Sequence, residues 1–140
     1  MKRKAQAELR RDYEDWTTHP DRCAICWIPT RRLAERFGDS LELAHVISRG
    51  QSGPRADVLG NVVLLCSSCH GSQHNTCYHY NGTQWPEIKQ GHLFRAKLEL
   101  GELSVHELAA ISGYTPRYIL DLTQISWPDP IQFERWKWGD

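Results

Sequence analysis

Two short apolar segments separated by a polar loop are the clearest feature of the hydropathy pattern. Residues 41–47 are mostly apolar and predict a strand. Residues 62–65, Val-Val-Leu-Leu, predict a second strand, because β-branched residues favour strands. The segment between them, 50–60, contains glycines and a proline and predicts a loop, and residues 69–80 can form a helix that an Asn-Gly pair ends. The order strand, loop, strand, helix predicts an α+β fold.

Further helical segments flank this unit. Residues 4–16 are rich in Ala, Glu, Arg and Gln, which favour a helix, and a His-Pro pair follows them. Downstream, the apolar pattern predicts three more helices, over residues 87–100, 103–112 and 115–123. We therefore interpret 1–85 as one unit with an N-terminal helix, and 86–140 as a helical extension.

Charge gives little support for a nucleic-acid partner by itself. The chain has 17 basic and 17 acidic side chains, so it is not globally basic. The segment from Arg22 to Arg55, however, has six Arg, no Lys and only three acids, which is enough for a local basic patch. No apolar run approaches the ~20 residues that cross a bilayer. The N-terminus also lacks the apolar core of a signal peptide, so we expect a cytoplasmic protein with no membrane partner.

Four of the five cysteines form two C-x-x-C pairs, Cys23 with Cys26 and Cys66 with Cys69. In a reducing cytoplasm such pairs are typical of metal sites. Four thiolates complete a tetrahedral zinc site and leave no position for water, so we expect a structural Zn²⁺. Redox-active dithiols are the alternative, but they usually accompany a thioredoxin-like βαβ setting, which the pattern lacks. Cys77 lies outside the pairs, and we interpret it as a small buried apolar residue.

The sequence around the cysteine pairs resembles the HNH endonuclease family. The resemblance rests on Leu43-Ala44-His45-Val46, on Gly60-Asn61, and on Cys66-Ser67-Ser68-Cys69-His70. Asn61 follows His45 by sixteen residues, and His70 follows Asn61 by nine. The family implies a ββα-metal finger, a treble-clef fold stapled by structural zinc. It also implies a divalent-metal-dependent DNA endonuclease that nicks DNA or cuts both strands and leaves 5′-phosphate and 3′-hydroxyl ends. Small stand-alone members of the family, including homing endonucleases, come from phages and act in the host cell.

The resemblance implies a role for each of the matching residues. His45 is the general base, a task that suits an imidazole at neutral pH. Asn61 braces the loop or approaches the metal, although a Gly-Asn pair is also common turn chemistry. His70 and His74 lie four residues apart, on one face of a helix. In colicin-type members both matching positions bind the catalytic ion, here Mg²⁺, Mn²⁺, Ni²⁺ or Zn²⁺, and in others only the first does.

Ala44 departs from the family pattern. Most HNH sequences have Asp or His before the base, where it ligates the metal, and Ala cannot do so. Three interpretations stay open. In the first, Glu42, on the same side of the strand as Ala44, reaches the ion with its longer side chain. In the second, His45 is itself a metal ligand. In the third, the site is degenerate and the protein no longer cuts DNA.

Some arginines are candidates for DNA contact. Arg49 and Arg55 can grip phosphates beside the cut, or they can be solvated loop charges. Residues 104–123 resemble a helix-turn-helix, with Ser104 as the first cap and Arg117 as the only basic side chain. The same features describe any helical hairpin that packs on a core.

Two non-enzymatic functions compete with the nuclease. One is a non-catalytic zinc-ribbon DNA-binding module, which Ala44 favours and which the set His45, Asn61, His70 and His74 opposes. The other is an adaptor for protein partners. The feature that suggests it is an aromatic C-terminal tail that can meet a partner protein or fold back, with Trp127, Phe133, Trp136 and Trp138.

Overall fold

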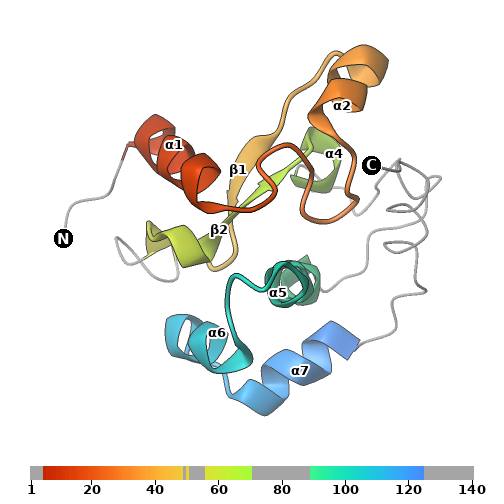
Figure 1. The fold of residues 1–140 in the computed structure, drawn as a ribbon. Coiled ribbons are helices and arrows are strands. Elements are labelled where there is room, and N and C mark those ends of the chain that lie inside the picture. Colours follow the sequence, from red (N-terminus) through yellow and green to blue (C-terminus); the bar gives the residue numbers. More distant parts are fainter. Residues whose placement is uncertain (1–4, 49, 51–55, 71–88, 125–140) are drawn as a thin grey trace.

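The structure is a computed structural model that describes residues 5–48, 50, 56–70 and 89–124 (Figure 1). Within these residues the elements follow the chain in the order α1 (Gln6–Trp16), α2 (Thr30–Phe37), β1 (Glu42–His45), the 3-10 turn η2 (Leu59–Asn61), β2 (Val62–Leu65), α4 (Ser67–His70), α5 (Lys89–Leu100), α6 (Val105–Ser112) and α7 (Pro116–Gln124). A two-stranded antiparallel sheet with helices around it is a mixed α and β fold, as the sequence predicts.

The two strands form the centre of the molecule. They pair antiparallel, with Glu42 opposite Leu65 and His45 opposite Val62. All four residues of β2 are buried, which explains why its sequence is apolar throughout instead of alternating. β1 buries its two middle residues and leaves Glu42 and His45 partly exposed at its two ends. The polar residues of this strand are therefore separated by its whole length.

The first strand is shorter than the predicted range 41–47, and Asn61 is the reason. The amide of Val46 donates to the backbone oxygen of Asn61 at 2.7 Å, but the amide of Ile47 donates to the side-chain Oδ1 of Asn61 at 2.8 Å. At Ile47 a side-chain amide thus replaces the backbone partner that a strand would have. The ladder stops there, and the loop towards η2 begins.

The helices cover the hairpin from two sides. α1 buries Leu9 and Tyr13, which are four residues apart and lie on one face. In Figure 1, α5, α6 and α7 lie together below the hairpin. A side chain at Gly60 would place Cβ 2.8 Å from Cδ2 of Leu103, so the loop before β2 and the segment after α5 approach closely. One hydrophobic cluster contains buried residues from both predicted units, and the division between 85 and 86 stays a prediction.

A buried polar network joins α1 to the end of α5. The Nζ of Lys97, which is fully buried, donates to Oε1 of Glu102 at 2.6 Å. Glu102 also accepts hydrogen bonds from the hydroxyl of Tyr13 at 2.7 Å and from that of Thr17. Burial lowers the pKa of Lys97 against the opposing effect of Glu102, and burial raises the pKa of Tyr13. The network is thus a buried, charged contact between α1, α5 and the segment after α5.

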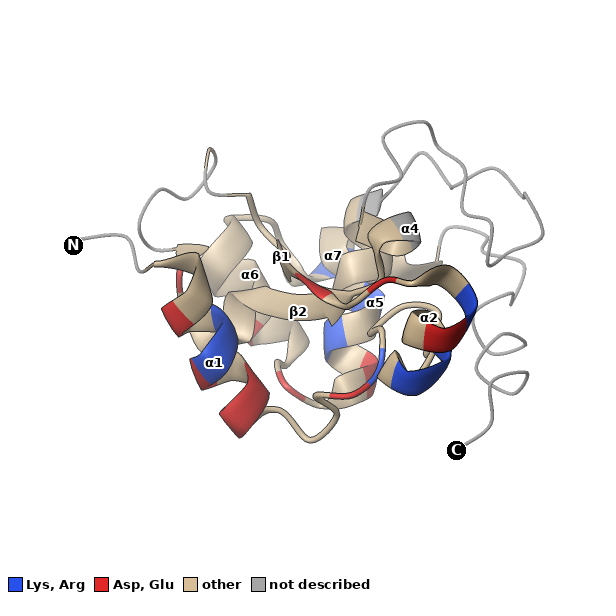
Figure 2. Ribbon diagram, turned by 90° about the horizontal axis from the view of Figure 1, so that it is seen from above, with Lys and Arg blue, Asp and Glu red and all other residues tan. Residues whose placement is uncertain are grey.

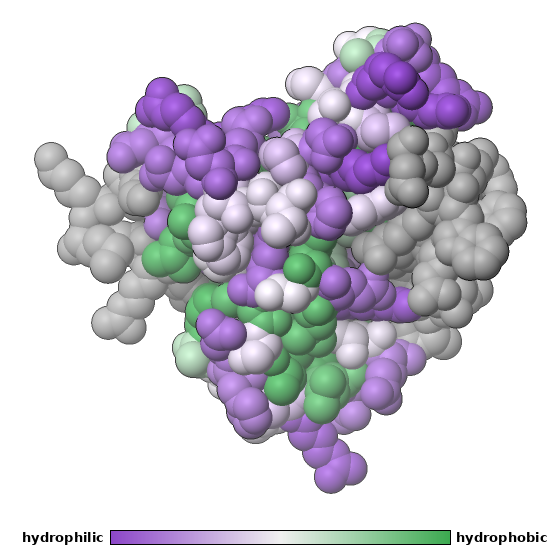
Figure 3. Space-filling view, in the orientation of Figure 1, coloured by the Kyte–Doolittle hydropathy of each residue, from purple (hydrophilic) through white to green (hydrophobic). Residues whose placement is uncertain are grey.

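The C-terminal helices form the hairpin that the sequence predicts. The amide of Glu107 donates to Oγ of Ser104 at 3.2 Å, and the amide of Ser104 donates to Oε1 of Glu107 at 3.0 Å, which completes a capping box. Gly113 ends α6 with a left-handed φ of 80°. Apolar surface gathers over these lower helices in Figure 3, whereas strongly hydrophilic residues cover α2. Reading of DNA by residues 104–123 remains a prediction.

None of the helices in the described part of the chain is both long enough and apolar enough to span a bilayer.

Candidate functional site

The four paired cysteines converge on one point. The Sγ atoms of Cys23, Cys26, Cys66 and Cys69 all lie within 4.8 Å of one another, and all four residues are buried. The Sγ atoms of Cys26 and Cys66, from different pairs, are 3.8 Å apart. The convergence predicted from the spacing is confirmed.

Backbone geometry turns the sulfur atoms inwards. At the first pair, the amide of Trp27 donates to the oxygen of Cys23 at 2.9 Å, and Trp27 adopts a left-handed φ of 69°. At the second pair, the amide of Cys69 donates to Sγ of Cys66 at 3.4 Å, a contact that favours a thiolate. The amide of Ala24 donates to the oxygen of Leu64 at 2.8 Å, so the first turn is attached to β2. The cluster thus joins the segment before α2 to the junction between β2 and α4.

The chemistry of the cluster suits a zinc ion. Burial raises the pKa of Cys23, but hydrogen bonds from the other three thiols outweigh this effect and lower it, whereas burial raises the pKa of Cys26. A bound cation would hold the sulfur atoms as thiolates, since metal ligation deprotonates a thiol. Four sulfur ligands in a closed, buried set are typical of structural Zn²⁺.

His45 is held by a carboxylate that the sequence did not single out. Its Nε2 lies 2.9 Å from Oδ1 of Asp57, and the two side chains are 13% and 1% exposed. An ionised carboxylate only accepts hydrogen bonds, so Nε2 carries the proton of this contact. In the neutral form of the ring, Nδ1 is the nitrogen that keeps a lone pair and can take a proton. Asp57 is the only acid in the loop 46–60, and this is the signal that would have found it.

Asn61 sets the geometry of this loop. Its Nδ2 donates to the oxygens of Ile47 and Ala56, each at 2.9 Å, and its Oδ1 accepts from the amide of Ile47. One buried amide therefore clamps the two ends of the loop together. Ile47 lies two residues after His45, and Ala56 lies next to Asp57, so the clamp brings the imidazole and the carboxylate close. This geometry is that of a loop brace.

A second carboxylate–imidazole pair lies at the other end of β1. Nδ1 of His70, on α4, is 2.7 Å from Oε1 of Glu42, and the side chains are 35% and 44% exposed. With Nδ1 donating to the carboxylate, Nε2 of His70 can ligate a metal, an arrangement common at metal-bound histidines. Glu42 and His45 are the first and last residues of β1, roughly 10 Å apart along the strand. The Glu42–His70 pair therefore lies at the opposite end of β1 from the His45–Asp57 pair.

Several predicted site residues are not part of what the structure describes. These are His74, Arg49 and Arg55, together with Cys77 and the aromatic tail. Of the predicted ligands of a catalytic ion, the structure brings together Glu42 and His70. Ala44 is 3% exposed and lies between the two ends of β1.

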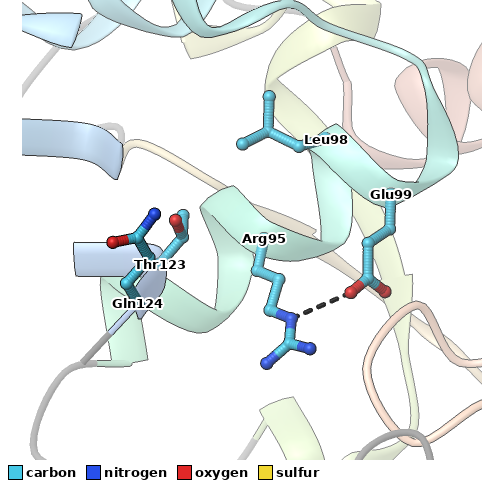
Figure 4. A pocket seen from close by; sticks show the side chains of 5 residues that line it. All are labelled: Arg95, Leu98, Glu99, Thr123 and Gln124. Carbon is cyan, nitrogen blue, oxygen red and sulfur yellow. Dashed lines mark hydrogen bonds and ion pairs between the residues drawn. The ribbon is translucent and has the colours of Figure 1, made fainter. Parts of the chain in front are cut away.

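A surface hollow lies away from these residues. It has a volume of about 380 Å³ and lies between α5 and α7, where Arg95 Nε donates to Glu99 Oε1 at 2.8 Å (Figure 4). Its other lining residues are Leu98, Thr123 and Gln124. The hollow contains none of the predicted catalytic or metal-binding residues.

Comparison with known proteins gives a family for the segment that carries the site. No curated protein and no solved structure matches the chain. The model of the HNH endonuclease family matches residues 23–76, which include both cysteine pairs and the residues of both carboxylate–imidazole pairs. Residues 23–76 of this chain are therefore similar to the HNH endonuclease family.

Proposed function

We propose that the protein is a divalent-metal-dependent DNA endonuclease in which His45 is the general base. The observation that carries the proposal is the contact between His45 Nε2 and Asp57, within a segment that matches a nuclease family. The contact leaves Nδ1 as a proton acceptor on a partly exposed side chain. General bases need this combination of a fixed tautomer and access to water.

In the proposed reaction, Nδ1 of His45 takes a proton from a water molecule as the water oxygen attacks phosphorus. The bond between phosphorus and the 3′ oxygen breaks, and the products are a 5′-phosphate and a 3′-hydroxyl. Asp57 keeps the imidazole in its orientation and stabilises the positive charge that the ring gains. Asn61 acts through the loop, because its side chain holds Asp57 beside His45.

Glu42 and His70, with His74 as a further predicted ligand, would hold the catalytic divalent ion. Such an ion supplies positive charge to the phosphate and to the leaving oxygen. The contact of Glu42 with His70 supports the interpretation in which Glu42 compensates for Ala44. Zn²⁺ at the four cysteines has a structural role, since it attaches α4, which carries His70, to the hairpin.

We expect His45→Ala to lower the rate of DNA cleavage by roughly 10²–10⁴-fold, the usual contribution of a general base. The measurement is nicking of supercoiled plasmid with Mg²⁺, Mn²⁺, Ni²⁺ or Zn²⁺, and with EDTA as the metal-free reference. His106→Ala, an exposed histidine on α6, is the matched control and should cut like the wild type. Equal cleavage by the two variants would remove His45 from the mechanism.

Asp57→Asn should also reduce cleavage, by up to about 10⁴-fold, because an amide can donate to Nε2 and favour the wrong tautomer. Nitrogen NMR shifts of His45 should then show the proton moved from Nε2 to Nδ1, an effect that a purely structural role would not produce. Asp121→Asn, on the exposed face of α7, is the control. An unchanged His45 tautomer with full activity would contradict the role given to Asp57.

The alternative is a non-catalytic zinc-ribbon DNA-binding module or adaptor, which the apolar Ala44 favours. DNA binding without cleavage under any of the four metals would support the binding module. Absence of both binding and cleavage would support the adaptor.

A further inference from the structure

Helix α2 carries an exposed basic surface that the proposed reaction does not use. Among its eight residues are three arginines and one glutamate, all exposed, and only Leu33 is buried. A concave surface of about 320 Å³ is lined by Arg31, Arg32, Glu35 and Arg36. Figure 2 shows more blue than red on α2, whereas α1 shows more red than blue. We name Arg31, Arg32 and Arg36 the α2 arginines.

The spacing of the α2 arginines is unfavourable for a helix in isolation. Arg31 has an acid, Glu35, four positions on, but the residue four positions after Arg32 is Arg36. Like charges at this spacing lie on the same face and repel each other. An anion bound between Arg32 and Arg36 would remove the repulsion.

Both ends of α2 are attached to the part of the molecule that carries the site. At its start, the amide of Thr30 donates to the oxygen of Asp21 at 2.8 Å, two residues before Cys23. At its end, the hydroxyl of Ser67 donates to the carboxylate of Asp39, and Ser67 begins α4, the helix of His70. Glu42 follows Asp39 by three residues. The end of α2 is therefore attached to the helix that carries His70.

The other helices offer less positive charge. α1 contains two arginines and four acids. The exposed charges on α7 are Arg117 and Asp121, which balance. On α5, Arg95 pairs with Glu99, the buried Lys97 pairs with Glu102, and the third basic residue is Lys89. Among the described helices, exposed arginines are thus most numerous on α2.

We propose that the α2 arginines bind the phosphate backbone of duplex DNA next to the strand that is cut. Guanidinium groups suit phosphates because their planar donors bind two oxygens at once. Contacts of this kind position a protein on DNA and do not depend on base sequence. This inference rests on the proposed nuclease function and names the surface on which the substrate lies.

The test measures how DNA affinity depends on salt. The full-length chain carrying His45→Ala is titrated against a short fluorescent DNA duplex at several KCl concentrations. Each lost phosphate contact lowers the slope of log Kd against log salt by about 0.9, so Arg32→Gln with Arg36→Gln should lower it by about 1.8. The reduction should be the same for unrelated DNA sequences. The double variant Arg32→Lys and Arg36→Lys keeps the charge and should retain most of the slope.

The matched control is Arg10→Gln with Arg11→Gln, on α1, which changes the net charge by the same amount. An equal slope for the two glutamine double variants would overturn the proposal, because net charge alone would then explain the effect. Plasmid cleavage by the otherwise wild-type chain is measured in parallel. If the chain cleaves DNA but the two glutamine double variants have equal slopes, the α2 surface is rejected and the nuclease function stands. If the chain neither cleaves nor binds DNA, both the α2 surface and the nuclease function are rejected.

Discussion

Cys66→Ser is expected to unfold the segment around the β-hairpin and to abolish zinc binding. Cys66 follows β2 directly, and its sulfur lies within 4.8 Å of the other three. Binding of structural zinc contributes on the order of 10 kcal/mol or more in small zinc-dependent folds. The whole stability of a typical domain is only about 5–15 kcal/mol. We therefore expect a hairpin with two four-residue strands to depend on a bound metal ion for its stability.

Bound zinc and circular dichroism measure this effect. The wild type should contain one Zn²⁺ per chain and lose its cooperative thermal transition when a strong chelator removes the ion. Cys77→Ser is the control, since Cys77 lies outside both pairs. Retention of one zinc ion and of the thermal transition by Cys66→Ser would show that the four thiols do not form the metal site.

Glu102→Ala is expected to destabilise the fold by about 3–5 kcal/mol, the cost of leaving a buried charge without its partner. Lys97 is fully buried, and its ammonium donates to Glu102 at 2.6 Å. The substitution also removes the acceptor of the Tyr13 and Thr17 hydroxyls, so α1 loses its polar attachment to α5. Urea unfolding at neutral pH gives the change in the free energy of unfolding.

Two further variants separate the buried charge from other effects. Combining Lys97→Met with Glu102→Ala should recover much of the lost stability, because no charge is then left unpaired. Glu99→Ala breaks the partly exposed pair with Arg95 on the same helix and should cost only about 0.3–0.5 kcal/mol. A loss for Glu102→Ala no larger than that for Glu99→Ala would mean that the pair contributes no more than a surface ion pair.

Local patterns predicted the elements well wherever one signal was strong. The apolar run 62–65 is β2 with the same bounds, and α6 begins after the Ser104 cap and ends at Gly113, as its capping residues indicate. The spacing of the cysteines predicted their convergence, because two C-x-x-C turns have few other ways to satisfy four thiols. The end of β1 was less predictable. Val46 and Ile47 are apolar like strand residues, but the side chain of Asn61, fourteen residues after Ile47, takes the place of a backbone partner.

The sequence by itself determined the cysteine cluster and the order of the described elements, and it singled out His45, Asn61 and His70, whose roles stay predictions. The cysteine pairs follow from residue type and short spacing, which are local properties of the chain, whereas the three other residues follow from the resemblance to the HNH family. Only the tertiary structure decided which carboxylate each histidine meets. Asp57 reaches His45 because Asn61 closes the loop, and Glu42 reaches His70 because the pairing of the strands places Glu42 opposite Leu65. Such contacts depend on how segments that are distant in the sequence pack together. Composition and periodicity are local properties, so they do not predict these contacts.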